Sequence, residues 1–99
     1  MADFYSEALE RLLKVIVQLE SVEEAYDFFS DVCTIKEMQD MSQRLQAAFL
    51  LASGENYQNI SKQVGISTAT ISRVSRCLNY GRGGYRRAIE KSGVNKNEN

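Results

Sequence analysis

Two neighbouring segments of this chain carry apolar residues at helical spacing, with a single glycine between them. The inner faces of the two segments consist of Tyr57, Ile60 and Val64, and of Ile71, Val74 and Leu78. Asn56 and Ser67 are suited to cap helix N-termini, and Gly65 stands where the first helix must end, because glycine adopts the left-handed turn conformation without a steric penalty. The pattern predicts two short helices joined by a tight turn over residues 57–78.

The outer face of the second predicted helix is short and polar, and it consists of Thr68, Ala69, Ser72, Arg73 and Arg76. An ordinary solvated face favours glutamate and lysine, so small hydroxyl residues with two arginines are unusual there. Such a face is typical of a helix-turn-helix, in which the second helix enters the DNA major groove by its N-terminal end. A plain helical hairpin that binds no nucleic acid is the alternative interpretation.

A broad apolar face marks the first predicted helix, residues 4–19. Its apolar residues are Tyr5, Ala8, Leu9, Leu12, Leu13, Val15, Ile16, Val17 and Leu19. At 100° per residue they cover an arc of roughly 200°, about twice what a helix on one small domain needs. The arc favours burial against a second subunit. A central helix surrounded by the chain's own elements is the alternative.

Two capping-box signatures predict the next two helices, since Ser21 is followed by Glu24 and Thr34 by Glu37. The helices are expected to end near Val32 and Ser53, with Ala25, Phe28, Phe29 and Val32 inward in one and Met38, Met41, Leu45, Ala48, Phe49 and Ala52 inward in the other. Beyond them we expect a break at residues 54–56, a flexible loop at residues 79–84 and a short basic helix at residues 85–91.

Length and composition indicate one all-helical domain, residues 1–92, followed by a polar, disordered tail at residues 93–99. The chain has no proline, six glycines and 43% apolar residues, which suits helices with short connections. Acidic residues precede the first apolar run, so no signal peptide is expected, and no segment reaches the ~20 apolar residues that span a bilayer. We expect a cytoplasmic protein with no membrane partner.

Charge is distributed unevenly along the chain. Residues 1–56 hold four Lys and Arg against eleven Asp and Glu, a net charge of −7, whereas residues 57–99 hold eight against two, a net charge of +6. The total of −1 therefore conceals an acidic half and a basic half, and the basic half contains the predicted helix-turn-helix. This asymmetry favours a nucleic-acid partner.

The inventory of reactive side chains argues against an enzyme or a metal protein. The chain has no histidine, and its two cysteines, Cys33 and Cys77, lack metal-site spacing. We expect both cysteines to be buried as small apolar residues of a reduced protein. Solvation of helix surfaces explains the carboxylates, so we predict no catalytic residues, no metal and no cofactor.

Two stretches are informative together: the capped helix from Thr34 that ends in Ser-Gly-Glu at residues 53–55, and Ala-Thr-Ile-Ser-Arg at residues 69–73. Both resemble the Trp repressor family, and more closely its Trp repressor-related branch called YerC/YecD. The resemblance covers roughly residues 5–90. It implies an all-α subunit of six helices, an intertwined homodimer, and two helix-turn-helix heads in successive major grooves.

The resemblance also implies an effector pocket between the third helix and the recognition helix. Arg44 and Arg73 match the two arginines that sandwich the indole ring in the Trp repressor, and Thr34 and Thr70 match the same pocket. Four positions depart from the family, because Val74 replaces a glycine, Cys77 replaces a serine, and Asp31 and Cys33 replace leucines. Valine adds bulk where a flat ring must pack, so tryptophan is not expected to bind, and the existence of another small effector stays open.

The favoured function is a homodimeric, sequence-specific regulator of transcription that binds double-stranded DNA, acting as a repressor. Arg73 and Arg76 would contact phosphate or guanine, and Thr68, Ala69 and Ser72 would meet base edges or thymine methyls. The remaining candidate contacts are Ser67 at the cap and, for the phosphate backbone, Lys62, Arg82, Arg86 and Arg87. The alternative is a protein-binding module on the same fold, with the acidic half as its interaction surface.

Overall fold

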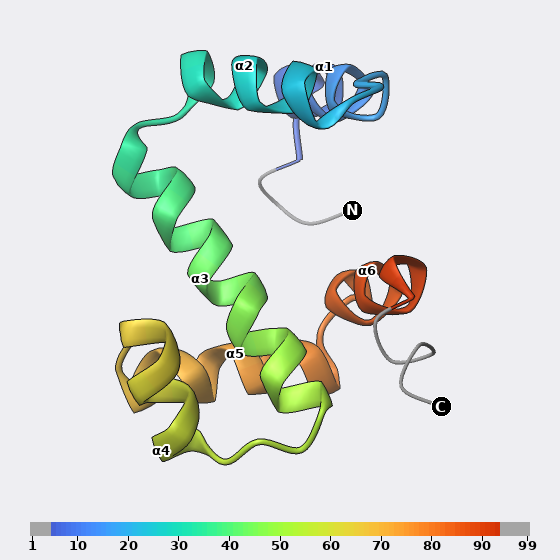
Figure 1. The fold of residues 1–99 in the computed structure, drawn as a ribbon. Helices are drawn as coiled ribbons and strands as arrows, with labels where there is room; N and C mark the ends of the chain where they lie inside the picture. The colour runs from blue at the N-terminus through green and yellow to red at the C-terminus, as the bar shows by residue number, and fades with distance from the viewer. Residues whose placement is uncertain (1–4, 94–99) are drawn as a thin grey trace. The chain divides into compact units, whose positions relative to one another are not determined.

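A computed structural model describes residues 5–93, which form six α-helices and one π-helical turn, with no strand in that range (Figure 1). The elements are α1 (Glu7–Ile16), α2 (Val22–Val32), α3 (Ile35–Ala52), α4 (Tyr57–Ile60), η1 (Ser61–Gly65), α5 (Thr68–Tyr80) and α6 (Gly84–Ser92). The all-α, six-helix prediction is confirmed. Residues 94–99 of the predicted tail lie outside the described range.

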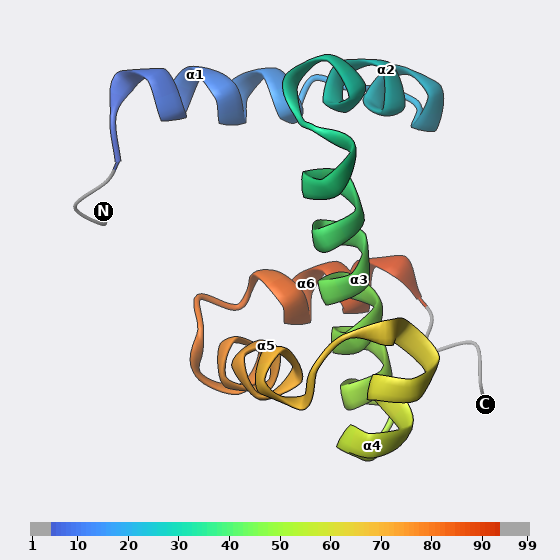
Figure 2. The same ribbon diagram turned by 90° about the vertical axis from the view of Figure 1, so that its left-hand side faces the viewer.

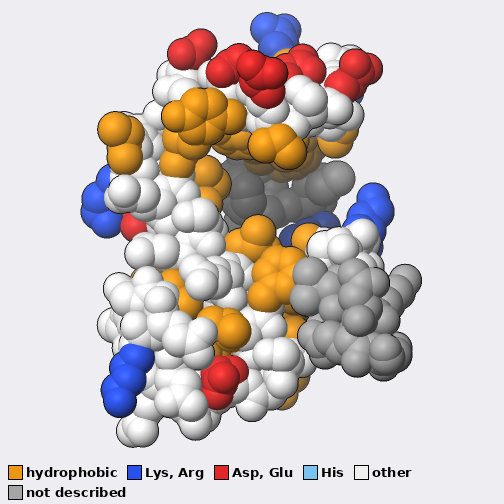
Figure 3. All heavy atoms as spheres, viewed as in Figure 1, with side chains coloured by type: hydrophobic (Ala, Val, Ile, Leu, Met, Phe, Trp, Pro, Cys, Tyr) orange, Lys and Arg blue, Asp and Glu red, His pale blue; other side chains and the backbone are white. Residues whose placement is uncertain are grey.

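The chain forms two compact units, Met1–Met38 and Gln39–Asn99. The N-terminal unit contains α1 and α2, and neither helix has a fully buried residue. Large apolar side chains are exposed there instead: Val17 is 79% exposed and Val22 88%. Val32, predicted to point inward, is 55% exposed, and α1 is shorter than predicted because Ser6 caps it and Val17 ends it. Figure 3 shows carboxylates and apolar side chains on the visible face of this unit.

Side-chain caps begin five of the helices, and four of these caps agree with the sequence-based prediction, whereas the cap of α1 at Ser6 was not predicted. The cap residues are Ser6 for α1, Ser21 for α2, Thr34 for α3, Asn56 for α4 and Ser67 for α5. The box at Thr34 is reciprocal: the Glu37 amide donates to Thr34 Oγ1 at 3.0 Å, and the Thr34 amide donates to Glu37 Oε1 at 2.8 Å. In α2 the side chain of Glu24 accepts a hydrogen bond from the amide of Glu20, one residue before the cap Ser21, and not from the amide of the cap itself. These bonds satisfy backbone amides that have no partner within the helix.

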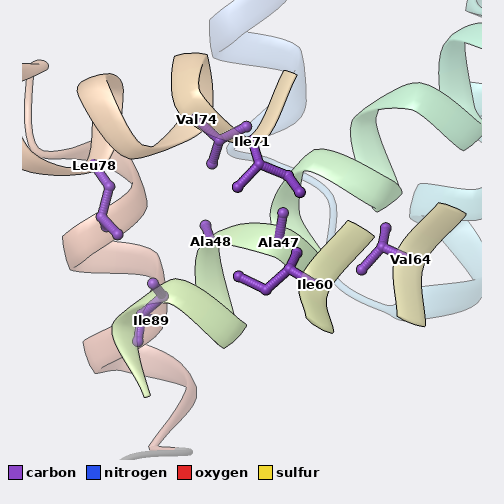
Figure 4. Close-up of a cluster of buried hydrophobic side chains, with 8 residues drawn as sticks. All are labelled: Ala47, Ala48, Ile60, Val64, Ile71, Val74, Leu78 and Ile89. Carbon is purple, nitrogen blue, oxygen red and sulfur yellow. The ribbon is translucent and has the colours of Figure 1, made fainter. Parts of the chain in front are cut away.

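A single apolar core holds the C-terminal unit together (Figure 4). Its buried residues are Ala47 and Ala48 from α3, Ile60 from α4, Val64 from η1, Ile71, Val74 and Leu78 from α5, and Ile89 from α6. The inner faces predicted for residues 57–78 are confirmed except at Tyr57, which is 38% exposed. The two alanines have no side chain beyond Cβ, so Ile60 and Ile71 can pack closely against α3.

The first predicted helix of the pair differs in form from the prediction. It is α-helical only through α4, and then widens into the π-helical turn η1 that ends at Gly65. Gly65 has a φ of +82°, the left-handed conformation expected there, and wide turns of this kind are common where a helix ends. The hydroxyl of Ser61 donates to the carbonyl of Ile66 at 2.6 Å and closes the turn before α5.

The connection between α5 and α6 is shorter than the predicted loop, since α5 continues to Tyr80 and α6 begins at Gly84. Figure 2 shows α5 nearly along its axis, with α6 following this connection. Gly81 ends α5 because it has no Cβ: an added Cβ would lie 2.4 Å from the carbonyl oxygen of Cys77. At Gly84, by contrast, an added Cβ would meet nothing within 4 Å.

This difference predicts opposite effects of the same substitution at two glycines. Gly81→Ala should lower the free energy of unfolding by about 1–3 kcal/mol, because the new methyl group collides with backbone that cannot move aside cheaply. Gly84→Ala should raise it by about 0.4–1 kcal/mol, because alanine restricts the unfolded chain and meets no obstacle in the helix. Urea unfolding followed by circular dichroism measures both. Equal effects of the two substitutions would contradict the assigned geometry.

Candidate nucleic-acid interface

Helix α5 presents the predicted outer face to solvent. Thr68, Ala69, Ser72, Arg73 and Arg76 are all exposed, while Ile71, Val74 and Leu78 on the opposite face are buried. At 100° per residue, Ala69 and Arg76 point directly away from the buried face. Arg73 is turned toward the flank that carries Thr70 and Cys77. The two arginines therefore have different surroundings, and Arg76 is central to the exposed face.

One of the predicted DNA-contact residues, Ser67, is the N-cap of α5. Ser67 Oγ accepts a hydrogen bond from the Thr70 amide at 3.1 Å and lies 3.0 Å from Thr70 Oγ1. Ser67 thus has a structural role in fixing where α5 begins, immediately after the turn. Gln43 from α3 also donates to the carbonyl of Val64 at 3.4 Å, which ties the turn to the unit's core.

Four more predicted contact residues, Lys62, Arg82, Arg86 and Arg87, are exposed on the same unit. Two of them form internal hydrogen bonds: Arg86 Nη2 donates to Asn79 Oδ1, and Arg87 Nη2 to the carbonyl of Arg82, each at 2.9 Å. Residues 39–93 hold eight Lys and Arg against three Asp and Glu, a net charge of +5. Residues 5–38 hold three against eight, a net charge of −5. The basic charge is therefore concentrated on the unit that presents α5.

A cavity of about 460 Å³ lies on the Arg73 flank of α5. Its lining residues are Arg44, Thr70, Arg73, Val74, Cys77 and Tyr85. Five of the six residues predicted for an effector pocket are thus brought together. Thr34 is not among the lining residues: it belongs to the N-terminal unit, where its hydroxyl and amide cap α3.

Tyr85 is the lining residue that the sequence analysis missed. It packs against the apolar core and lies four residues before Ile89, which is 3% exposed. Residues four apart share a face of a helix, so the spacing of Tyr85 and Ile89 in the basic segment was the available signal. Tyr85 also lines a second cavity of about 430 Å³, with Cys77, Gly81, Arg82, Gly84 and Ala88.

The prediction that both cysteines are buried is wrong. Cys77 is exposed, because it lies on the cavity flank of α5 and not on the buried face formed by Ile71, Val74 and Leu78. Cys33 is half-buried at the C-terminal end of α2, where the helix stops. Val74, in contrast, is 2% exposed and contributes to both the core and the cavity wall.

Residues 5–93 contain no cluster of three or more His, Cys, Asp or Glu that could hold a metal ion. None of the helices described here is both long and apolar enough to cross a membrane.

Comparison with known proteins places this geometry in a family. The family model described as Trp repressor protein matches residues 7–93. YerC of Bacillus subtilis (strain 168), described as an uncharacterized protein, is 48% identical over 83 residues, which span 84% of this chain and 80% of the relative.

Two crystal structures have the same fold. A TrpR-like protein from Eubacterium eligens ATCC 27750 has a TM-score of 0.87 at 48% identity, covering 90% of this chain and 92% of the other. A protein from Staphylococcus aureus, proposed to be a Trp repressor, also has a TM-score of 0.87, at 42% identity, covering 91% and 90%.

Proposed function

The chain belongs to the Trp repressor family, and we propose from this membership that it is a homodimeric, sequence-specific DNA-binding regulator that represses transcription. The family is regulatory rather than enzymatic. One observation carries the proposal: α5 buries Ile71, Val74 and Leu78 while presenting a polar, arginine-bearing face on a basic unit. A rigid helix with such a face, held directly after a tight turn, is suited to enter a major groove. Repression then follows most simply from occlusion of DNA.

The exposed side chains divide the work of binding between bases and backbone. Thr68, Ala69 and Ser72 lie in the N-terminal turns of α5, where they meet base edges and thymine methyl groups. Arg76 is placed to contact guanine or phosphate. Lys62 and Arg82 supply charge for the phosphate backbone, which gives affinity but not sequence preference.

Homodimerisation is supported by the exposed apolar surface of the N-terminal unit. Neither α1 nor α2 has a fully buried residue, and Leu13, Val17, Val22, Tyr26 and Val32 are each at least 45% exposed. A soluble domain seldom leaves so many large apolar side chains in water. We propose that a second copy covers them, so that the two subunits share a core and hold their α5 helices about 34–36 Å apart.

We propose that tryptophan is not an effector of this protein. Val74 is 2% exposed and packs in the core, and a valine on a helix has a nearly fixed χ1 angle. Its methyl groups therefore cannot swing away from the cavity that Arg44 and Arg73 line. The charge of the two arginines suits a smaller, anionic effector instead.

A protein-binding module on the same fold is the second candidate, and the net charge of −5 on residues 5–38 is the observation that favours it. Salt dependence separates the two functions. DNA binding should weaken steeply as salt rises, because each phosphate contact releases counterions, and a mobility shift with genomic DNA at several salt concentrations measures this.

The first prediction concerns the arginines of α5. Arg73→Ala or Arg76→Ala should weaken binding to a selected operator by about 1–3 kcal/mol if the side chain reads a guanine. If the contact is to phosphate, all sequences should be bound more weakly, with a smaller salt slope. Fluorescence anisotropy measures both, and Lys14→Ala on α1 is the control that removes an equal charge elsewhere. Wild-type affinity in both arginine variants would exclude α5 as the recognition helix.

The second prediction concerns the subunit interface. Leu12→Asp or Ile16→Asp should unfold the protein rather than release a folded monomer, because interlocked subunits share one core. Gln18→Asp, an equal charge at an exposed position just after α1, should leave the fold intact. Sedimentation and circular dichroism distinguish the outcomes. A folded monomer of the unmutated protein at micromolar concentration would refute the dimer.

The third prediction is that the unmutated protein does not respond to tryptophan. Packing an indole ring against Val74 should cost on the order of 1–3 kcal/mol, or roughly tenfold to a hundredfold in affinity. Calorimetry should show no heat with millimolar L-tryptophan, and operator affinity should not change. Val74→Ala and Val74→Gly remove the methyl groups of Val74 from the cavity wall and so test the steric argument directly, although glycine also costs ~1 kcal/mol of helix stability. Tryptophan-dependent DNA binding by the unmutated protein would show that the steric argument is wrong.

A further inference from the structure

The junction between α5 and α6 carries an exposed, basic and aromatic surface outside the N-terminal turns of α5. Tyr80, the last residue of α5, is 86% exposed, more than any other large hydrophobic residue between positions 39 and 93. Arg82 and Arg86 are exposed beside it in the sequence, across the short connection. Tyr80 does not belong to the apolar core of the described residues, nor does it line either of the two cavities beside α5.

Asn79 fixes the position of one of these arginines. Its Nδ2 atom donates to the carbonyl of Ser75 at 3.0 Å and lies 3.3 Å from Ser75 Oγ, so its Oδ1 atom faces the other way. That oxygen accepts from Arg86 Nη2 at 2.9 Å, which joins the end of α5 to α6. A guanidinium group has five N–H donors, so Arg86 can bind an anion while it keeps this bond.

The length of α5 determines which part of a DNA duplex this junction can reach. Twelve residue steps separate Thr68 from Tyr80, a distance of about 18 Å along the helix axis. The major groove is only about 8.5 Å deep. When α5 enters the groove by its N-terminal turns, the Tyr80 end therefore lies beyond the base edges and outside the groove, where the sugar–phosphate backbone is the part of the duplex nearest to it.

We infer that the α5–α6 junction is a second phosphate-binding surface, in which Tyr80, Arg82 and Arg86 contact DNA backbone flanking the bases read by α5. The inference rests on the proposed DNA-binding function. Phosphate oxygens accept hydrogen bonds from tyrosine hydroxyls as well as from guanidinium groups. Asn79 is a positioning residue: it holds the Arg86 guanidinium at the surface and does not itself contact DNA.

Loss of a charged side chain and loss of a neutral one should affect the salt dependence of DNA binding differently. Arg86 neutralises a phosphate, so its loss should reduce the slope of log affinity against log salt by about 0.9. The hydroxyl of Tyr80 is neutral, so its loss should weaken binding without changing the slope. Loss of Asn79 leaves the charge of Arg86 in place but mobile, which should likewise lower affinity at an unchanged slope.

The experiment measures affinity of the full chain for a selected operator by fluorescence anisotropy over a range of salt concentrations. Tyr80→Phe and Asn79→Ala should each weaken binding roughly threefold to tenfold, the effect of one exposed hydrogen bond. Arg86→Ala should also flatten the salt slope. Lys91→Ala, which removes the same charge farther along α6, should leave the slope unchanged. The double variant of Asn79 and Arg86 should bind no more weakly than Arg86→Ala alone, because the asparagine acts through the arginine.

A shorter duplex tests where the surface binds. Trimming the base pairs that flank the half-sites should remove the penalty of Arg86→Ala and Tyr80→Phe, because the contacted phosphates are gone. Sedimentation of Tyr80→Phe should show an unchanged dimer, and dissociation would instead place Tyr80 in the subunit interface and overturn the inference.

The outcomes separate this inference from the function on which it rests. Salt-independent binding, or no binding, by the unmutated protein would overturn the proposed DNA-binding function and this surface with it. Normal binding by the unmutated protein together with wild-type affinity in Tyr80→Phe and Asn79→Ala would overturn the surface alone. An equal salt slope in Arg86→Ala and Lys91→Ala would also overturn it, since the loss of net charge alone would then explain the effect of removing the arginine.

Discussion

The shared apolar core to which α3, α4, η1, α5 and α6 all contribute is the constraint on which the rest of the C-terminal unit depends. Ala47, Ala48 and Ile71 are fully buried, and Val74 is 2% exposed. Replacing either alanine with a larger residue would force the side chains that share this core apart, because a core packed at crystal-like density has no spare volume. The same packing determines which face of α5 meets solvent. It also fixes Val74 in the cavity wall, so one side chain contributes both to the core and to the cavity lining.

Local physical chemistry was enough to predict most of this fold from the sequence. Asn56 and Ser67 cap their helices because their side chains accept amides three residues on, and Gly65 takes the left-handed conformation that the turn requires. The features that the sequence did not reveal arise from tertiary packing. The π-helical turn η1, the exposure of Cys77 and the contribution of Tyr85 to the cavity depend on how helices meet, which apolar periodicity alone does not determine.

Charge and apolarity are distributed between the two units in a way that suits a dimeric DNA-binding protein. The N-terminal unit is acidic and leaves large apolar side chains exposed, whereas the C-terminal unit is basic and has its own core. An acidic surface is repelled by phosphate, so it favours presentation of α5 rather than α1 or α2 to DNA. We propose that contact between subunits satisfies the exposed apolar residues, while the basic unit remains free to bind.

The spacing of half-sites in DNA tests the central claim most directly. Genomic fragments that the unmutated protein retains can be selected, sequenced and footprinted at single-nucleotide resolution. Two α5 helices in a symmetric dimer predict an imperfect palindrome, with two protected major grooves on one face of the duplex and half-site centres about 10–10.5 base pairs apart. Failure to enrich any sequence, or protection of one isolated half-site, would contradict the account of a dimer that reads DNA through paired recognition helices.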